Sequence, residues 1–489
     1  MPDIRPVVIF ANFHERFMLE VSQAVGQKQN ARVLHCCFWN GESPDEEDLL
    51  CNYFDLLSFI SSKSNSLLAV AADLNPLILN QFQVNYGEFR HILERYALNR
   101  FDEELSLNFF HLLTGYWNRK LSKFSKSSTQ IIFDSTPHQP WDYTLYIVAL
   151  KLGIKVVMIK RTKLHKHLLL SSSLKNQDFV KVEIVKSQLN LSQMASGVYW
   201  NQYTDKKDNL IKEGIRSAFR TLKLLKKITL QFLTGYYQNH YFNLTRLDYL
   251  SSVSKLLMQQ LQSQALLWKY WGKGNFKREL NWLSNVQKQD IYVALHYQPE
   301  RTTIPEAGFL ADQLTAIRMI SQVIPKESKI YVKEHPQQLL IYDLNLRKTS
   351  YRSPRYYSVL MSIPNVILVP KRIRASEIIK RVGIVSSATG SVLWEALQIG
   401  KPVITFAPTW LSGNNSVIDL SSQPLTISIF REMLEQTREI VTSNTISHLS
   451  ELIPYLVPAP HSDSQASSST EERQREIENL ASAFIRAIQ

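Results

Sequence analysis

Short apolar runs alternate with amphipathic stretches along the first part of the chain. Strands are expected over 6–11, 32–37, 130–134 and 155–159, and helices over 15–27 and 142–152. Gly153 follows the second helix and is expected to end it, because glycine readily adopts the left-handed conformation of a helix stop. Strands and helices in this order predict a parallel sheet with right-handed crossovers.

The pattern changes between 209 and 271, where strand signals vanish and apolar residues recur at helical spacing. Basic residues crowd the polar side of this stripe, since the chain has eight basic and three acidic residues from Asp205 to Lys227. A packed helix with a solvated basic face is the simplest interpretation. The alternative is that the helix over 209–232 lies on an anionic membrane or attracts a lipid-phosphate acceptor.

Strands and helices alternate again beyond 285, which predicts a second α/β domain. Its strands are expected over 290–295, 329–333, 365–369, 382–386 and 402–406. A polar linker with proline and serine then precedes an amphipathic helix that is free to pack on the first domain. The expected segments are an N-terminal domain over 1–200, a basic helical insertion over 201–285, a C-terminal domain over 286–457, the linker over 458–470 and the final helix over 471–489.

Composition narrows the class of protein. The chain has 489 residues, of which 44% are hydrophobic and 20% charged, as expected of a globular protein with two to three domains. Its net charge of +13 favours anionic partners such as phosphorylated donors, acidic glycans or a membrane surface. Three cysteines exclude a disulfide scaffold and a four-cysteine zinc site. No secretory signal or membrane-spanning run is recognisable, so we expect a cytoplasmic protein that is soluble or peripheral.

The most informative stretch, 382–406, consists of a strand, a turn of small hydroxyl-bearing residues, and a helix that ends near Gly400. Backbone N–H groups at such a helix start can approach an anion closely, and the helix dipole favours negative charge there. A carboxylate one turn into the helix suits two adjacent ribose hydroxyls. The turn taken alone is more simply a helix cap. The candidate phosphate- and ribose-binding residues are Ser386, Ser387, Thr389, Gly390, Ser391 and Glu395.

A second candidate element is Lys333-Glu334-His335-Pro336, which directly follows an expected strand. Ligands bind at the carboxyl ends of strands in open α/β sheets. His335, with Lys333 nearby, can donate to a phosphate oxygen and stabilise charge on a departing nucleotide. A His-Pro pair alone is more often an ordinary loop, but together with the hydroxyl-rich turn it favours a site.

Polar groups also follow the strand over 290–295, in the stretch His296–Thr303. Arg301 can clamp a phosphate or carboxylate as a fork, and Gln298 or Glu300 can orient a sugar. A plain turn opened by Pro299 is an equally good interpretation.

In the first domain, Asp134 ends a strand and His138 follows it. Either side chain is a candidate base for an acceptor hydroxyl. Asp142 is expected instead to cap the next helix. Between Arg119 and Lys186 there are thirteen basic and four acidic residues, which either attract an acidic acceptor or form solvated surface.

Several common motifs are absent from the sequence. It has no Walker-type glycine loop, no Gly-x-Gly-x-x-Gly after the first strand, no His-Glu-x-x-His helix and no Gly-x-Ser-x-Gly elbow. ATPases, dehydrogenases, metallopeptidases and α/β-hydrolases are therefore disfavoured.

Together these stretches resemble the bacterial capsule polysaccharide biosynthesis protein family, which includes the β-Kdo transferases of capsule assembly. The resemblance is carried by LHYQPERTT (295–303), YVKEHP (331–336) and SSATGSVLWEALQIGKPVITF (386–406). It implies a GT-B arrangement, with two Rossmann-like domains that face a cleft and a nucleotide sugar held by the C-terminal domain. The family's His-Pro element falls on His335 and Pro336, its phosphate turn on Ser386, Ser387, Thr389 and Ser391, and its helix carboxylate on Glu395.

The resulting hypothesis is a glycosyltransferase that needs neither a metal nor a cofactor. It transfers a sugar, such as Kdo, from a CMP- or UDP-sugar to an acidic surface glycan or a lipid-linked acceptor in the cytoplasm, with contact to the inner membrane left open. His335, Lys333 and the turn would neutralise the leaving phosphate. Glu395 would hold the ribose, and Asp134 or His138 would take the acceptor proton.

Two rivals remain at this point. A sugar-nucleotide epimerase of the same architecture would convert the donor without an acceptor. A non-catalytic module would use its positive charge to bind an acidic polysaccharide for export. Nucleic acid is not an expected partner, because no aromatic RNA-binding motif is present.

Overall fold

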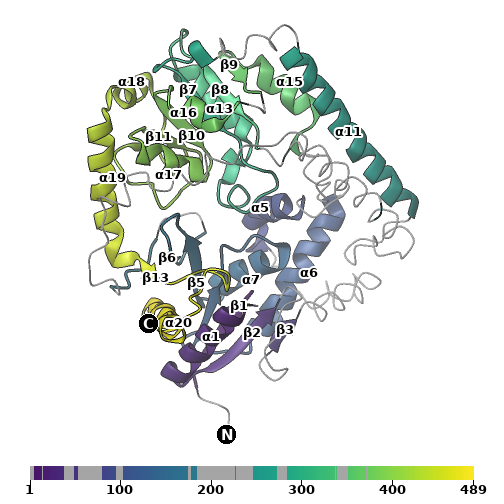
Figure 1. The fold of residues 1–489 in the computed structure, drawn as a ribbon. Coiled ribbons are helices and arrows are strands. Elements are labelled where there is room, and N and C mark those ends of the chain that lie inside the picture. The colour runs from purple at the N-terminus through teal and green to yellow at the C-terminus, as the bar shows by residue number, and fades with distance from the viewer. Residues whose placement is uncertain are drawn as a thin grey trace. The chain divides into compact units, whose positions relative to one another are not determined.

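The computed structural model describes residues 5–13, 15–37, 49–52, 80–94, 103–174, 178–183, 226, 246–272, 283–335, 338, 351–370 and 373–489. The chain divides into two compact units, shown in Figure 1. Unit 1 comprises Met1–Glu94, Arg100–Gln188 and Glu451–Gln489, and unit 2 comprises Arg95–Asn99 and Leu189–Ser450. Unit 2 ends within α19 (Arg438–Leu452), and the chain then continues in unit 1.

Unit 1 contains a seven-stranded sheet in the order β13-β6-β5-β4-β1-β2-β3. Its strands are β1 (Val7–Ala11), β2 (Arg32–Cys37), β3 (Leu49–Asn52), β4 (Thr129–Phe133), β5 (Lys155–Arg161), β6 (His167–Ser171) and β13 (Val457–Pro458). β1 to β5 pair in parallel, and β6 pairs antiparallel with both β5 and β13. The order of the strands reverses between β1 and β4, which creates a switch point there.

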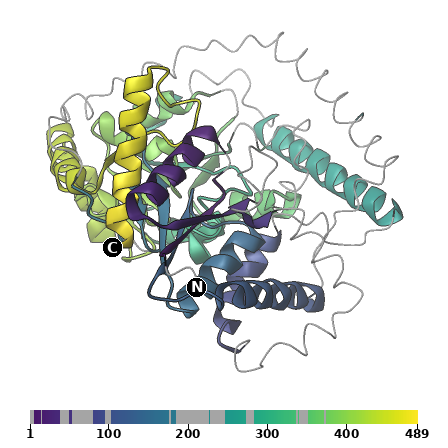
Figure 2. The same cartoon turned by 90° about the horizontal axis from the view of Figure 1, so that it is seen from below.

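The described helices of unit 1 are α1 (Arg16–Gln29), α5 (Gln83–Glu94), α6 (Glu103–Leu121), α7 (Pro140–Lys151), the short η4 (Ile453–Tyr455) and α20 (Thr470–Ile488). Figure 2 shows the C-terminal α20 lying alongside α1. Phe484 of α20 forms ring contacts with Phe10 and Phe13, at centroid distances of 6.4 and 6.1 Å. The apolar stripe of α20 is thus part of the core of unit 1.

Unit 2 contains a six-stranded sheet in the order β12-β11-β10-β7-β8-β9. Its strands are β7 (Ile291–Ala294), β8 (Ile330–Lys333), β9 (Val366–Leu368), β10 (Ile384–Ser387), β11 (Val403–Thr405) and β12 (Val417–Asp419). Every pair in this sheet is parallel, so all carboxyl ends lie at one edge. The chain runs from β7 to β9 on one side and from β10 to β12 on the other, and the switch point therefore lies between β7 and β10.

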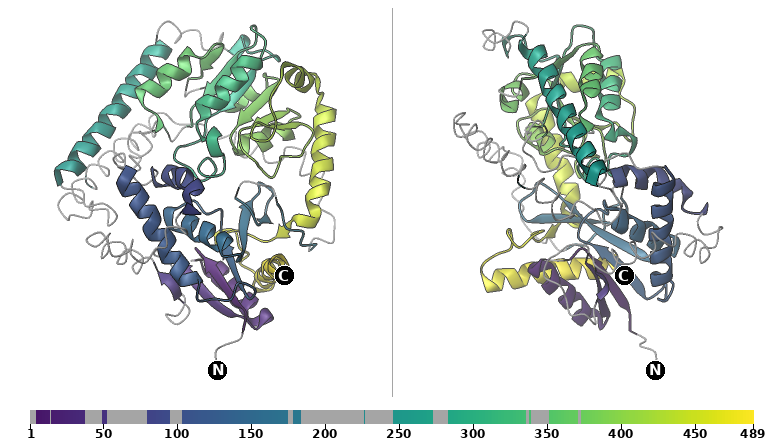
Figure 3. Two further views of the ribbon diagram at one scale, coloured as in Figure 1. Left: turned by 180° about the vertical axis from the view of Figure 1, so that it is seen from behind. Right: turned by 90° about the vertical axis from the view of Figure 1, so that its right-hand side faces the viewer.

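The described helices of unit 2, besides α19, are α11 (Arg246–Gly272), η2 (Gly308–Ala311), α13 (Gln313–Val323), α15 (Pro354–Ser362), α16 (Ala375–Ile379), α17 (Ser391–Gln398) and α18 (Ile427–Glu435). Figure 3 shows the long α11 running beside α15. Apolar residues of the strands pack with α13, α15 and α18 into one buried core. This core supports the edge at which the strands end.

The structure confirms the expected α/β fold with two Rossmann-like units. The nine expected strands are all present, with ends that shift by at most two residues. Gly153 and Gly400 both have positive φ, 73° and 77°, as expected of helix stops. The sequence missed β3, β6, β12 and β13. The basic helix expected over 209–232 lies outside the described residues, apart from Lys226. None of the helices in the described parts of the chain combines the length and the apolar character needed to cross a membrane.

Candidate nucleotide-sugar site

The carboxyl ends of β7, β8 and β10 bring three polar segments together in unit 2. β7 leads into the loop 295–303, β8 into Glu334 and His335, and β10 into the turn 388–390 before α17. These strands are neighbours in the sheet, and the switch point lies between two of them. This is the place where open α/β sheets bind ligands.

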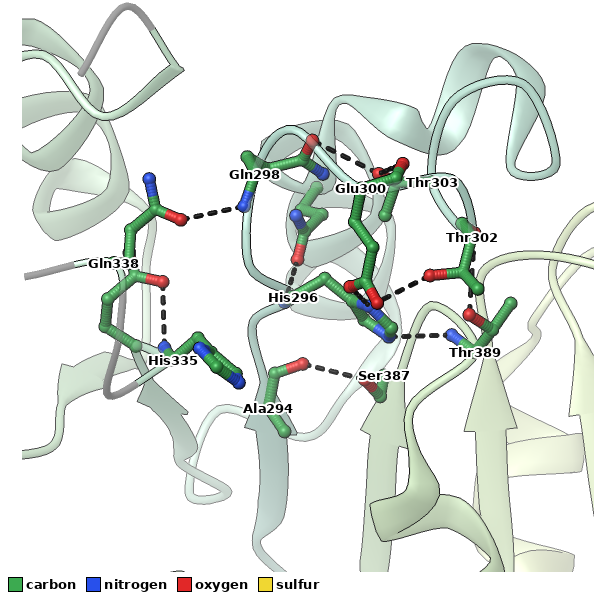
Figure 4. Close-up of polar contacts among 12 residues, drawn as sticks. Ala294, His296, Gln298, Glu300, Thr302, Thr303, His335, Gln338, Ser387 and Thr389 are labelled. Atoms are coloured by element: carbon green, nitrogen blue, oxygen red, sulfur yellow. Dashed lines mark hydrogen bonds and ion pairs between the residues drawn. The ribbon is translucent and has the colours of Figure 1, made fainter. Parts of the chain in front are cut away.

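His296 links the two strands at the switch point. Its Nε2 accepts the backbone N–H of Thr389 at 3.0 Å, and its Nδ1 lies 3.0 Å from Oε2 of Glu300 (Figure 4). The backbone N–H of His296 donates to Oε1 of Gln313 at 2.8 Å. The residue is 8% exposed, so these contacts hold the ring in one position. His296 is not among the site residues expected from the sequence, although its place just beyond β7 was a signal.

The partners of His296 fix its tautomer. A backbone N–H is always a donor, so Nε2 must be the unprotonated acceptor and the ring proton sits on Nδ1. That proton is donated to the carboxylate of Glu300. Burial opposes the ionisation of Glu300, but the hydrogen bond from His296 holds its pKa below the ordinary value.

His335 belongs to the same cluster. Its backbone N–H donates to Oε1 of Glu334 at 2.9 Å, and its ring lies edge-on to Tyr297 with 5.7 Å between centroids. In Figure 4 the ring points from the loop after β8 toward the end of β7. Burial lowers the pKa of His335, while the charges of Glu300 and Glu334 act in the opposite direction. The neighbouring Pro336 lies outside the described residues.

A buried ion pair positions both histidine-bearing loops. Nε of Arg352 contacts Oε2 of Glu334 at 2.7 Å, and the hydroxyl of Tyr357 donates to the same oxygen at 3.0 Å. Another guanidinium nitrogen of Arg352 donates to the carbonyl of His296 at 3.1 Å. Since Glu334 also holds the backbone of His335, the Glu334–Arg352 pair joins the loop after β7 to the loop after β8.

The hydroxyl groups of the predicted phosphate turn are engaged within the protein. Ser386 is fully buried and donates to the carbonyl of Ile404 at 2.9 Å, so the fold does not bring it to the edge surface. Ser387 donates to the carbonyl of Ala294 at 2.9 Å. Thr389 contacts the carbonyl of Thr302 at 3.5 Å, and Ser391 donates to Oε1 of Glu395 at 3.0 Å. The backbone amides that start α17, not the hydroxyls, are thus the main donors that this turn offers to an anion.

The remaining predicted residues of unit 2 lie in and beside this cluster. The ammonium of Lys333 contacts the carbonyl of Pro370 at 3.3 Å, so it is directed toward the chain after β9. Gln298 is 1% exposed and accepts a hydrogen bond from Thr303 at 3.1 Å, while its buried Nε2 has no protein partner. Nε of Arg301 is also buried without a partner. Both unpaired donors fit a ligand that supplies acceptor oxygens.

In unit 1, Asp134 and His138 gather around Asp142 at the end of β4. Asp142 accepts the backbone N–H of His138 and of Gln139, at 2.9 and 2.6 Å, and thereby caps α7 as the sequence predicts. Nδ1 of His138 is 2.8 Å from the carbonyl of Thr136, and Asp134 accepts from Ser135 at 2.9 Å. Burial, with a smaller contribution from the charge of Asp134, raises the pKa of Asp142 to about 8.

No protein-family model matches the chain, and no curated protein sequence matches it. Solved structures that match include the UDP-GlcNAc 2-epimerase from Methanocaldococcus jannaschii, at 10% identity over 91% of this chain and 99% of that one, with a TM-score of 0.25. They also include the KpsC β-Kdo 2,7-transferase from Thermosulfurimonas dismutans, at 12% identity over 74% and 88%, TM-score 0.28. A third is the α,α-trehalose 6-phosphate synthase from Burkholderia multivorans, at 9% identity over 98% and 95%, TM-score 0.30. One of these three structures is a β-Kdo transferase, and the likeness concerns the fold alone.

Proposed function

We propose that the chain is a glycosyltransferase whose unit 2 binds a nucleotide sugar at the carboxyl ends of β7, β8 and β10. The observation that carries this proposal is the convergence of His335, the loop 295–303 and the start of α17 at one switch point. Such a place combines backbone donors, a helix dipole and an imidazole, which together suit a phosphate that gains charge as it departs.

The donor-binding residues have separate roles in this proposal. The first backbone amides of α17, beyond Gly390, take the phosphate, and His335 donates to an oxygen of the departing nucleotide. Arg301 and Gln298 supply the donors that the protein itself leaves unpaired. Glu395 holds the ribose hydroxyls and gives up its bond to Ser391 when it does so. The turn is held in place by the hydroxyl contacts of Ser387 and Thr389. Lys333 lies at the end of β8 and contacts the chain after β9.

The acceptor proton is taken in unit 1 by Asp134 or His138. Asp134 is partly exposed and His138 is 19% exposed at its side chain, whereas Asp142 is fully buried. A group that contacts an acceptor must be reachable, so the first two residues suit a base better than Asp142 does. The mechanism that we propose uses these side chains and neither a metal nor a cofactor.

The finer assignment rests on the motifs of residues 295–303, 331–336 and 386–406, which resemble those of the capsule polysaccharide biosynthesis family. We take the donor to be a CMP- or UDP-sugar, with Kdo as the leading candidate sugar. The acceptor is an acidic surface glycan or a lipid-linked glycan, which the net charge of +13 would attract. In this proposal the sugar transfer takes place in the cytoplasm of a bacterium. A lipid-linked acceptor would be presented there at the inner membrane.

A panel of nucleotide sugars, incubated with the full chain in the presence and absence of glycan acceptors, tests the proposal. Release of CMP or UDP that depends on the acceptor, together with a product heavier by one sugar, supports a transferase. Conversion of the donor without any acceptor would identify an epimerase instead. The Asp134→Asn variant should lose transfer and retain nucleotide binding, whereas His335→Ala should weaken both.

A further inference from the structure

We propose that His296 is a positioning residue, which holds the turn 388–390 in the shape that receives the donor's phosphate. The residue belongs to the loop after β7, and the turn follows β10, so the contact crosses the switch point. This inference rests on the proposed function, because it assigns a role at that same site. It does not require His296 to contact the sugar or the nucleotide.

The ring of His296 lies directly against the turn. Besides the 3.0 Å bond to the N–H of Thr389, its Nε2 would lie only 3.3 Å from a Cβ placed on Gly390. The turn therefore packs against the ring, and the position of the imidazole determines the orientation of the turn. The N–H groups of Ser391 and Val392, which begin α17, have no carbonyl partner within the helix and are the ones left for an anion.

Histidine suits this position because its ring must both accept one hydrogen bond and donate another. The turn needs an acceptor at Nε2, and Glu300 needs a donor at Nδ1. A neutral imidazole meets both demands at once. The carboxamide of asparagine reaches only the place of Nδ1, and that of glutamine only the place of Nε2, so each can meet one of them. The hydrogen bond to Glu300 therefore favours the tautomer with the proton on Nδ1. In this tautomer Nε2 is free to accept from Thr389 and so holds the turn.

This distinction gives a pair of variants with opposite predictions. The carbonyl oxygen of Gln in His296→Gln can occupy the place of Nε2 and accept from Thr389. The amide nitrogen of Asn in His296→Asn can occupy the place of Nδ1 and donate to Glu300, but nothing then accepts from Thr389. His448, a second buried histidine of unit 2 with Nε2 at 2.9 Å from the carbonyl of Trp410, provides the control variant His448→Asn.

The first measurement is the Kd for the donor's nucleotide, with CMP and UDP as probes, by titration calorimetry of the full chain. We expect His296→Gln to stay within about threefold of the wild type and His296→Asn to bind about tenfold more weakly, since only His296→Asn removes the acceptor of the Thr389 N–H. His448→Asn should bind as the wild type does. Equal affinities for His296→Gln and His296→Asn, whether both unchanged or both reduced, would overturn the inference.

The second measurement does not depend on donor binding. Side-chain ¹⁵N NMR of the wild-type chain should show His296 as the neutral Nδ1–H tautomer, with its signal assigned by loss in His296→Gln. Observation of the Nε2–H tautomer would overturn the role of His296 even if the donor binds. Absence of nucleotide binding by a wild-type chain with the Nδ1–H tautomer would instead contradict the proposed function.

Discussion

The backbone N–H of Thr389 donates to Nε2 of His296, a residue 93 positions earlier in the chain, at 3.0 Å. This bond ties the loop after β7 to the turn after β10. The loop after β7 is in turn tied to the loop after β8, through Arg352 and Glu334. The three segments of the candidate site are thus joined in one hydrogen-bonded network. A change in any of them should therefore alter the positions of the other two.

Gly390→Ala tests how closely the turn must fit. A Cβ at this position would lie 2.9 Å from Oγ of Ser387 and 3.3 Å from the ring of His296, so one of these side chains or the turn must shift. We expect nucleotide affinity to fall about tenfold and the free energy of unfolding to fall by about 1–3 kcal/mol. Calorimetry and chemical denaturation measure the two effects.

Gly87→Ala is the matched control for this variant. Gly87 lies inside α5, and a Cβ there would meet nothing within 4 Å. Alanine in the interior of a helix should raise the free energy of unfolding by about 0.5–1 kcal/mol and leave nucleotide affinity unchanged. If Gly390→Ala also leaves nucleotide affinity unchanged and does not lower the free energy of unfolding, the turn has room for a Cβ beside Ser387 and His296.

Removal of one partner from the buried Glu334–Arg352 pair should be costly. Glu334→Leu leaves the guanidinium of Arg352 without its carboxylate, and we expect a loss of about 3–5 kcal/mol in the free energy of unfolding. The double variant Glu334→Leu/Arg352→Leu should lose much less than the sum of the single losses, because it leaves no unpaired buried charge. Denaturant titrations of the wild type, Glu334→Leu, Arg352→Leu and the double variant give the coupling free energy between the two residues. If the two single losses add up in the double variant, Glu334 and Arg352 do not stabilise the fold as a pair.

Asp142 should make the stability of unit 1 depend on pH. Burial raises its pKa to about 8 in the folded chain, above the ordinary value of 3.8. Between these values the folded state holds a proton that the unfolded state has released, so stability falls as pH rises. Relative to Asp142→Asn, which cannot ionise, the wild type should lose up to about 1.4 kcal/mol per pH unit from pH 5 to pH 8. A constant difference between the two proteins over this range would show that Asp142 does not take up the proton.

Strand positions were predictable from sequence because parallel strands buried on both faces are short apolar runs with clear ends. Ile330–Lys333 and Val403–Thr405 are examples. The strand Val417–Asp419 escaped notice because it has only two apolar residues, whereas Val403–Thr405 lies within the longer apolar run PVITF (402–406). His167–Ser171 was missed as well, since it pairs antiparallel with the strand just before it, Lys155–Arg161, where a helix was expected to separate neighbouring strands.

The site was predictable only in outline. The sequence shows that a histidine and a hydroxyl-rich turn follow strands, and strand order then brings them to one edge. It does not show where a hydroxyl donates, and Ser386 turns out to donate to Ile404 beneath that edge. The role of His296 was hidden because its acceptor function becomes visible only when Thr389 is folded against it.

The most direct test of the account is a calorimetric titration of the full chain, wild type and His335→Ala, with CMP, UDP and their sugar conjugates. We expect the wild type to bind one of these nucleotides at a single site per chain. His335→Ala should weaken this binding at least about tenfold through loss of a charge-assisted hydrogen bond. A wild type that binds none of them, or a His335→Ala variant that binds with unchanged affinity, would contradict it.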